Sequence, residues 1–96
     1  MTSKQRSNLK SIAANLSPVG QVGKGGISET MVRSLSDALE ARELIKVNVL
    51  TNAEEDAKTL GAQLGEALSA EVVAVIGRKV ILYRRSSRKG FAHIEF

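Results

Sequence analysis

The sequence predicts an α/β domain of the α+β, two-layer kind, ordered α-β-α-β-α-β-β, with a four-stranded mixed sheet packed by helices. Three segments carry apolar residues at helical spacing, and the segments between them are apolar runs typical of strands. A glycine-led two-residue turn joins the last two runs. The first strand, second helix and second strand form a βαβ unit, so these two strands should be parallel with a right-handed crossover.

The first 26 residues predict a helix, a short strand and a loop. Residues 3–16 have the periodicity of a helix in four apolar positions, Leu9, Ile12, Ala13 and Leu16. Pro18 disfavours helix at the residue before it and ends the segment. Residues 19–22 then form a short strand, and three glycines among residues 23–26 indicate a loop.

The middle of the chain predicts two further helices around a strand. Ser28 is a good N-cap for a helix that runs to about Arg42, and residues 44–50 alternate as a strand. Asn52 caps a third helix over residues 53–69. The acidic residues 54–56 would lie in its first turn and complement the helix dipole.

The last quarter of the chain predicts a hairpin and a basic tail. Residues 71–76 and 79–84 are apolar strands on either side of Gly77-Arg78. Residues 85–90 are a polar connection, and residues 91–96 alternate again, as in an edge strand or in a loose end. We expect a single domain over residues 1–96 with a basic tail at 85–96, which is either ordered or flexible.

Composition narrows the functional classes. The 96 residues include no Cys, which excludes a disulfide framework, thiol catalysis and cysteine-based zinc sites. The apolar stretches are too short to span a bilayer, and no signal peptide is visible, so we expect a soluble, cytoplasmic protein. We also expect it to be a monomer.

Charge is unevenly distributed along the chain. Residues 1–28 carry four basic and no acidic side chains, residues 29–71 carry four basic and nine acidic ones, and residues 72–96 carry six basic ones and one acidic one. Basic ends around an acidic middle predict a positive face that suits a polyanion such as nucleic acid. The alternative is a mixed solvated surface with a basic tail.

The loop of Gly23, Lys24, Gly25 and Gly26 is the most informative local feature. It lies between a strand and a helix capped at Ser28, where free backbone N–H groups and the positive helix end favour a phosphate. It matches neither the Walker loop nor the dinucleotide fingerprint. A lone Gly-x-x-Gly is also compatible with a simple tight turn.

Other basic residues extend this candidate site. Lys4, Arg6 and Lys10 lie on the first helix, and Arg78, Lys79, Arg84 and Arg85 lie on the hairpin and its exit. Such residues neutralise phosphates, although they also serve solubility and protect a sheet edge. Tyr83 is able to stack on a base, but half-buried packing is the commoner role of such a strand tyrosine.

No catalytic or metal-binding constellation is visible. The single His93 lies in the tail and reads as an exposed residue, and no residues pair as general acid and base. We therefore expect a binding module without a cofactor, a metal or a small-molecule substrate.

Several segments together resemble the CRM domain, the chloroplast RNA splicing and ribosome maturation family, in its single-domain bacterial YhbY-like branch. They are residues 18–28 (PVGQVGKGGIS), 42–47 (RELIKV) and 75–84 (VIGRKVILYR). The family commonly has a Thr-Gly-Ala-like turn before the third strand, whereas this chain has Leu68-Ser69-Ala70-Glu71. The tail after Arg85 varies in the family, so the resemblance implies nothing about its basic residues.

The resemblance implies RNA binding through the loop of residues 23–26, likened to the loop with which KH domains clamp a nucleic-acid backbone. It also implies association with precursors of the large ribosomal subunit. We expect a non-catalytic protein that binds structured ribosomal RNA with little sequence specificity and a steep loss of affinity with salt. The alternatives are a protein–protein adaptor that docks on a ribosomal protein or assembly factor, and a DNA-binding variant of the same module.

Overall fold

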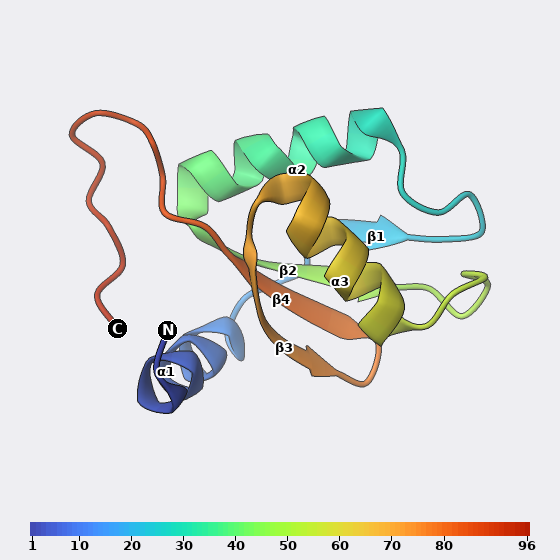
Figure 1. Cartoon of the computed structure of the whole chain (residues 1–96), viewed down its shortest axis with the longest axis horizontal. Coiled ribbons are helices and arrows are strands. Elements are labelled where there is room, and N and C mark those ends of the chain that lie inside the picture. The colour runs from blue at the N-terminus through green and yellow to red at the C-terminus, as the bar shows by residue number, and fades with distance from the viewer.

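The computed structural model describes all 96 residues and has the predicted order of elements (Figure 1). The helices are α1 (Ser3–Ala13), α2 (Glu29–Arg42) and α3 (Ala57–Leu68), and the strands are β1 (Gly20–Val22), β2 (Leu44–Val49), β3 (Glu71–Ile76) and β4 (Lys79–Tyr83). They build one four-stranded sheet in the order β1-β2-β4-β3. Strand β1 is parallel to β2, and the other pairs are antiparallel, which confirms the mixed sheet.

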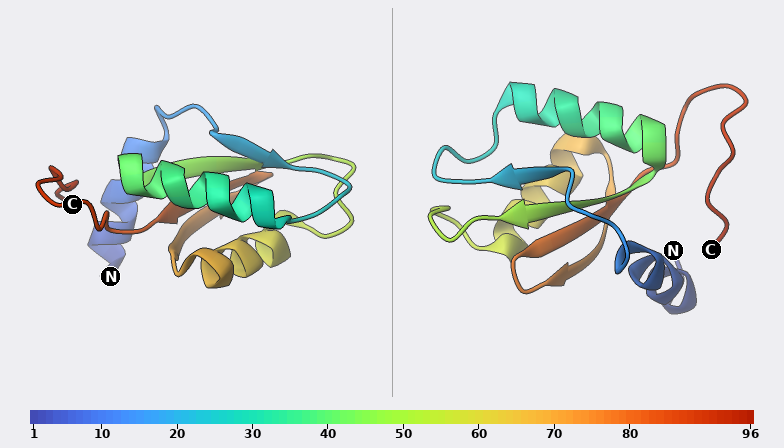
Figure 2. Two further views of the ribbon diagram at one scale, coloured as in Figure 1. Left: turned by 90° about the horizontal axis from the view of Figure 1, so that it is seen from above. Right: turned by 180° about the vertical axis from the view of Figure 1, so that it is seen from behind.

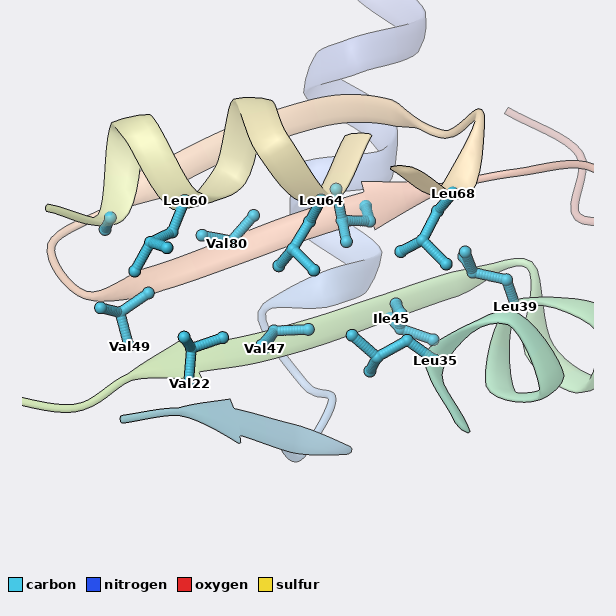
Figure 3. Packing of buried hydrophobic residues seen from close by; sticks show 12 residues of the cluster. Val22, Leu35, Leu39, Ile45, Val47, Val49, Leu60, Leu64, Leu68 and Val80 are labelled. Atoms are coloured by element: carbon cyan, nitrogen blue, oxygen red, sulfur yellow. The ribbon is translucent and has the colours of Figure 1, made fainter. Parts of the chain in front are cut away.

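Helices α2 and α3 cover one face of the sheet and form the main core with it (Figure 3). The strands contribute Val22, Ile45, Val47, Val49, Val80 and Leu82, and the helices contribute Leu35, Leu39, Ala57, Leu60, Leu64 and Leu68. Each of the larger buried side chains stabilises the fold by about 1.5–3 kcal/mol. Because side chains alternate along a strand, Lys46 and Asn48 of β2 face the opposite side of the sheet.

Helix α1 covers only part of that opposite face. Leu9 and Ala13 pack against Leu44, Val73 and Ile81 in a second, smaller core. Figure 2 shows α1 lying across the end of the sheet nearest the two termini, so the other end of this face, where Gln21 and Lys79 are exposed, stays open. The apolar stripe of α1 that packs against the sheet is narrower than the periodicity predicts. Ile12, one of the four predicted apolar positions, is 40% exposed. No helix combines the length and the hydropathy that a membrane span requires.

The third helix begins later than the sequence predicts. Its N-cap is Asp56, not Asn52, and the Asp56 carboxylate accepts a hydrogen bond from the Thr59 backbone N–H at 2.8 Å. This hydrogen bond lowers the pKa of Asp56. Residues 51–55 form turns between β2 and α3, so Glu54 and Glu55 precede the helix. The first helix likewise ends at Ala13, and residues 14–16 follow it without helical structure.

The C-terminal tail is held by a buried carboxylate. Residues 91–96 are neither an edge strand nor a loose end, because they pack on the domain without regular structure. Glu43 is fully buried, and its carboxylate accepts hydrogen bonds from the backbone N–H groups of Ser86 and Ile94, both at 2.7 Å. His93 Nδ1 lies 2.5 Å from the same carboxylate. The expectation of a free, exposed His93 is therefore wrong.

Glu43 also shapes the backbone at the end of α2. It has a φ of 65°, which is uncommon for a residue with a side chain and stores local strain. Burial raises the pKa of Glu43, but the hydrogen bonds from His93, Ile94 and Ser86 outweigh it and leave that pKa below its ordinary value. The tail therefore depends on a charged, fully hydrogen-bonded carboxylate.

We predict that Glu43→Gln lowers the free energy of unfolding by about 2–3 kcal/mol at pH 7, because the amide would turn a donor toward groups that donate. The folded-state pKa of Glu43 lies below its ordinary value of 4.5. The carboxylate therefore stabilises the protein fully above this value, and the contribution is lost as the pH falls through the folded-state pKa. Urea unfolding across the acidic range measures both effects.

Glu66→Gln is the matched control, because Glu66 is exposed on α3 and makes no ion pair. It should unfold like the wild type at pH 7. The acid-induced loss of stability should be shallower in Glu43→Gln than in the wild type. Equal stability of Glu43→Gln and Glu66→Gln would show that the buried carboxylate does not hold the tail.

Candidate nucleic-acid interface

The loop of residues 23–26 is a tight turn with an open tip. It leaves the sheet at the buried Val22 and closes with a hydrogen bond from the Gly26 N–H to the Gly23 carbonyl at 3.0 Å. Gly26 has a φ of 69°, which favours glycine. Lys24 and Gly25 are exposed, and their backbone N–H groups donate to no acceptor in the protein. A ligand oxygen therefore has access to both.

Helix α2 starts immediately after this loop. Ser28 is its N-cap, as predicted, and the Ser28 hydroxyl accepts a hydrogen bond from the Met31 N–H at 3.1 Å. An oxygen used in this way caps the helix, so Ser28 positions the loop against the helix N-terminus. The N-terminal end of a helix favours an anion beside it.

The side of the loop that faces α3 is acidic. Glu54 and Glu55 line a hollow with the glycines of the loop, and the Glu55 carboxylate accepts a hydrogen bond from the Gln63 amide at 2.9 Å. Carboxylates that line the same hollow as the loop disfavour a phosphate there. An anionic ligand is therefore favoured on the other side of the loop, toward the open face of the sheet.

That open side is basic and polar. Gln21, Asn48 and Lys79 lie in one row across β1, β2 and β4, and the Lys79 amine donates a hydrogen bond to the Asn48 amide oxygen at 3.0 Å. Arg78 and Lys79 line a hollow with residues 48–52, and this hollow contains no carboxylate. A Cβ atom at Gly23 would meet Leu50 and Asn52 of the same segment. The hollow thus begins beside the loop.

Two of the predicted arginines are engaged within the protein. The Arg6 guanidinium donates hydrogen bonds to the carbonyls of Val72 and Val73 at 2.5 and 3.0 Å, beside the β-bulge of β3, and pairs with Glu71 at 3.0 Å. Arg84 donates to the Leu68 carbonyl at 2.9 Å and to the Ser36 carbonyl at 3.1 Å. These contacts tie α1 to β3, and the segment that follows β4 to α2 and α3. A role of Arg6 and Arg84 in nucleic-acid binding stays a prediction.

The remaining predicted residues divide between two ends of the molecule. Lys24, Arg78 and Lys79 lie toward the end where β1 and β2 finish, whereas Lys4 and Arg85 lie toward the termini (Figure 1). The arrangement is consistent with a basic track that starts at the loop and follows the open face of the sheet. Tyr83 packs edge-on against Phe96, with ring centroids 4.9 Å apart, as expected of a half-buried tyrosine.

Lys46 is a basic residue of the open face that sequence reasoning missed. The alternating strand over residues 44–50 was predicted from its apolar positions alone, so the lysine drew no attention. Its position in the sequence could have revealed it. Ile45 and Val47 face the main core, and because side chains alternate along a strand, Lys46 between them faces the other side of the sheet.

Comparison with known proteins gives a consistent match. Residues 1–84 match the CRS1 / YhbY (CRM) domain. The chain is 44% identical over 86 residues to "Probable RNA-binding protein YqeI" of Bacillus subtilis, with 90% of each chain covered. It is 36% identical over 88 residues to an "RNA-binding protein" of Haemophilus influenzae, covering 90% of this chain and 87% of the relative. The solution structure of a hypothetical protein from Staphylococcus aureus superimposes with a TM-score of 0.78 at 47% identity, covering 93% of each chain.

We predict that Arg84→Met lowers the free energy of unfolding by about 2 kcal/mol, because it leaves carbonyl groups of α2 and α3 without their donor. Arg85→Met is the control, since Arg85 is exposed and makes no hydrogen bond or ion pair. It should change stability by less than about 0.5 kcal/mol. Urea unfolding measures both variants, and equal effects would contradict the structural role of Arg84.

Proposed function

The chain belongs to the CRS1 / YhbY (CRM) domain family, and on this premise we propose that it is a non-catalytic RNA-binding protein. The observation that carries the proposal is the open tip of the loop at Lys24 and Gly25, with two free backbone N–H groups and one exposed cation. This combination suits a phosphate of an RNA backbone. The RNA-binding names of the relatives support the same ligand.

The charges around the loop support one direction of approach. Glu54 and Glu55 disfavour RNA on the α3 side, whereas Arg78 and Lys79 favour it along the open face of the sheet. The chain has one Tyr, two Phe and no Trp, so few rings are available for base stacking. We therefore propose that it contacts the backbone of structured RNA and discriminates little between sequences.

We further propose that the RNA is ribosomal and that the protein acts, as a cytoplasmic monomer, in assembly of the large ribosomal subunit. The resemblance of residues 18–28, 42–47 and 75–84 to the single-domain bacterial branch of the family supports this role. An adaptor that binds a ribosomal protein is the rival function. It differs in a testable way, because an adaptor keeps its partners after the RNA is digested.

The loop is tested by Gly25→Asp. A Cβ atom added at this exposed position meets nothing within 4 Å, so the melting temperature should not change. A carboxylate at the tip repels a phosphate, and we expect the affinity for a structured ribosomal RNA fragment to fall by at least about tenfold. Filter binding or fluorescence anisotropy at fixed salt measures this change.

Gly25→Asn is the matched control, because it adds the same volume without the charge. It should weaken binding less than Gly25→Asp does. If Gly25→Asp binds RNA like the wild type while the wild type binds tightly, the loop is not the contact. If the wild type itself does not bind RNA, the proposed function is wrong.

The cellular role is tested by sedimentation of the native protein from a gentle lysate. We expect comigration with a precursor of the large ribosomal subunit, loss of comigration at high salt, and loss after nuclease treatment. Protein that stays at the top of the gradient would remove the ribosomal part of the proposal. Comigration that survives complete digestion of the RNA would instead favour the adaptor.

A further inference from the structure

A second basic hollow lies between α1 and the open face of the sheet. It has a volume of about 490 Å³, within the size range of small-ligand sites. Its charged lining consists of Lys10 from α1, Lys46 from β2 and Lys79 from β4, and Ser7 and Ser11 add hydroxyl groups. The other lining residues are small or aliphatic, and none is acidic. Three cations thus converge on a space with no protein anion.

Lys46 is the unusual member of this group. Lys46 is only 8% exposed, yet its side chain makes no hydrogen bond and no ion pair. Its amine is not sealed from solvent, because the protein has no buried side-chain nitrogen without a partner. The aliphatic stem is therefore covered while the charged head reaches the groove. A partly covered cation without a counter-ion favours the binding of an anion.

The other buried or half-buried charged side chains have partners in the protein, whereas Lys46 has none. Glu43 has three hydrogen-bond partners and Arg84 contacts two carbonyl groups and the Glu40 carboxylate. The carboxylate at the near edge of the sheet, Glu71, is paired with Arg6. Lys46 therefore lacks the anion that the protein supplies to its comparable charges.

The groove adjoins the basic track that starts at the loop. Lys79 lines both this groove and the hollow that contains Arg78 and Asn52, and the latter begins beside Gly23. A backbone that leaves the loop along the open face therefore meets Lys79 and then Lys46. Repeated phosphates on one polymer match cations spaced along such a path, whereas a single small anion would use the groove alone.

We propose that the groove between α1 and the sheet is a second phosphate-binding site, in which Lys46, with Lys10 and Lys79, holds a backbone phosphate of RNA that is also engaged by the loop. This inference rests on the proposed function and adds the site and the path of the RNA. The sites are chemically distinct, because the loop offers backbone N–H groups and the groove offers amines.

Lys46→Met tests the groove, since it keeps the unbranched stem and removes the charge. We expect the RNA affinity to fall about fivefold to tenfold at low salt, and the slope of log K against log salt to decrease by about 0.7–0.9, the value for one phosphate contact. Lys58→Met is the control, because Lys58 is exposed on α3, which covers the opposite face of the sheet. It should leave the salt slope unchanged.

The outcomes separate this inference from the proposed function. If the wild type binds RNA and Gly25→Asp does not, but Lys46→Met behaves like Lys58→Met, only the groove is wrong. If the wild type does not bind RNA, both proposals fail. Lys46→Met should unfold at or above the wild-type temperature, so a loss of affinity is not a loss of fold.

Inorganic phosphate is the second probe and distinguishes a polymer from a free anion. We expect it to shift the NMR signal of the Lys46 amine only weakly, at millimolar concentration, and RNA to displace it. Tight saturation by inorganic phosphate that RNA does not displace would make the groove a site for a free anion and overturn the proposal.

Discussion

The parallel pairing of β1 with β2 is the constraint on which the rest of the molecule depends. Parallel strands finish at the same edge of a sheet, so the loop after Val22 and the segment after Val49 emerge side by side. Strand β4 is antiparallel to β2 and begins at that same edge, which brings the turn at Gly77 and Arg78 there too. The loop after Val22, the segment after Val49 and the turn at Gly77 and Arg78 are distant in sequence but thus form one surface.

The crossover helix of this unit also determines which face is free. Helix α2 returns the chain over one face, and α3 joins it there, so the main core occupies that side completely. The short α1 is left to cover the other face, and its small core reaches only Leu44, Val73 and Ile81. The asymmetry leaves polar positions of β2 and β4 in contact with solvent beside the loop.

The basic residues divide into two groups by what they contact, although they look alike in sequence. Arg6 and Arg84 use the fork of the guanidinium to join carbonyl groups of different elements. Lys24 and Lys46 have no partner in the protein. The number of basic residues is therefore larger than the number of cations that are free to bind a ligand. The geometry of each side chain determines to which group it belongs.

Periodicity and capping predicted the elements because these signals are local. Ser28 identified the start of α2, and Gly77, with a φ of 58°, marked the hairpin. The start of α3 was missed because Asn52 and Asp56 both have capping side chains, and only the path of residues 51–55 decides between them. The family resemblance, and with it the expected loop, was also readable from residues close together in sequence.

The contacts that sequence reasoning missed join distant residues. His93 meets Glu43 across 50 positions and Arg6 meets Val72 across 66, and no periodicity encodes such pairs. For Lys46, alternation indicates the face of the sheet but not whether a helix covers it. The width of the α1 stripe decides that, and the exposure of Ile12 shows that the stripe is narrow.

The bulge in β3 has a consequence for how the protein behaves at high concentration. Strand β3 is an edge of the sheet, and it exposes Val75 and Ile76, features that invite another chain to add as a fifth strand. The register shift between Val72 and Ala74 interrupts the regular edge, and Arg6 already occupies the carbonyls of Val72 and Val73. The same arginine that fastens α1 thereby protects the molecule from assembling into aggregates edge to edge.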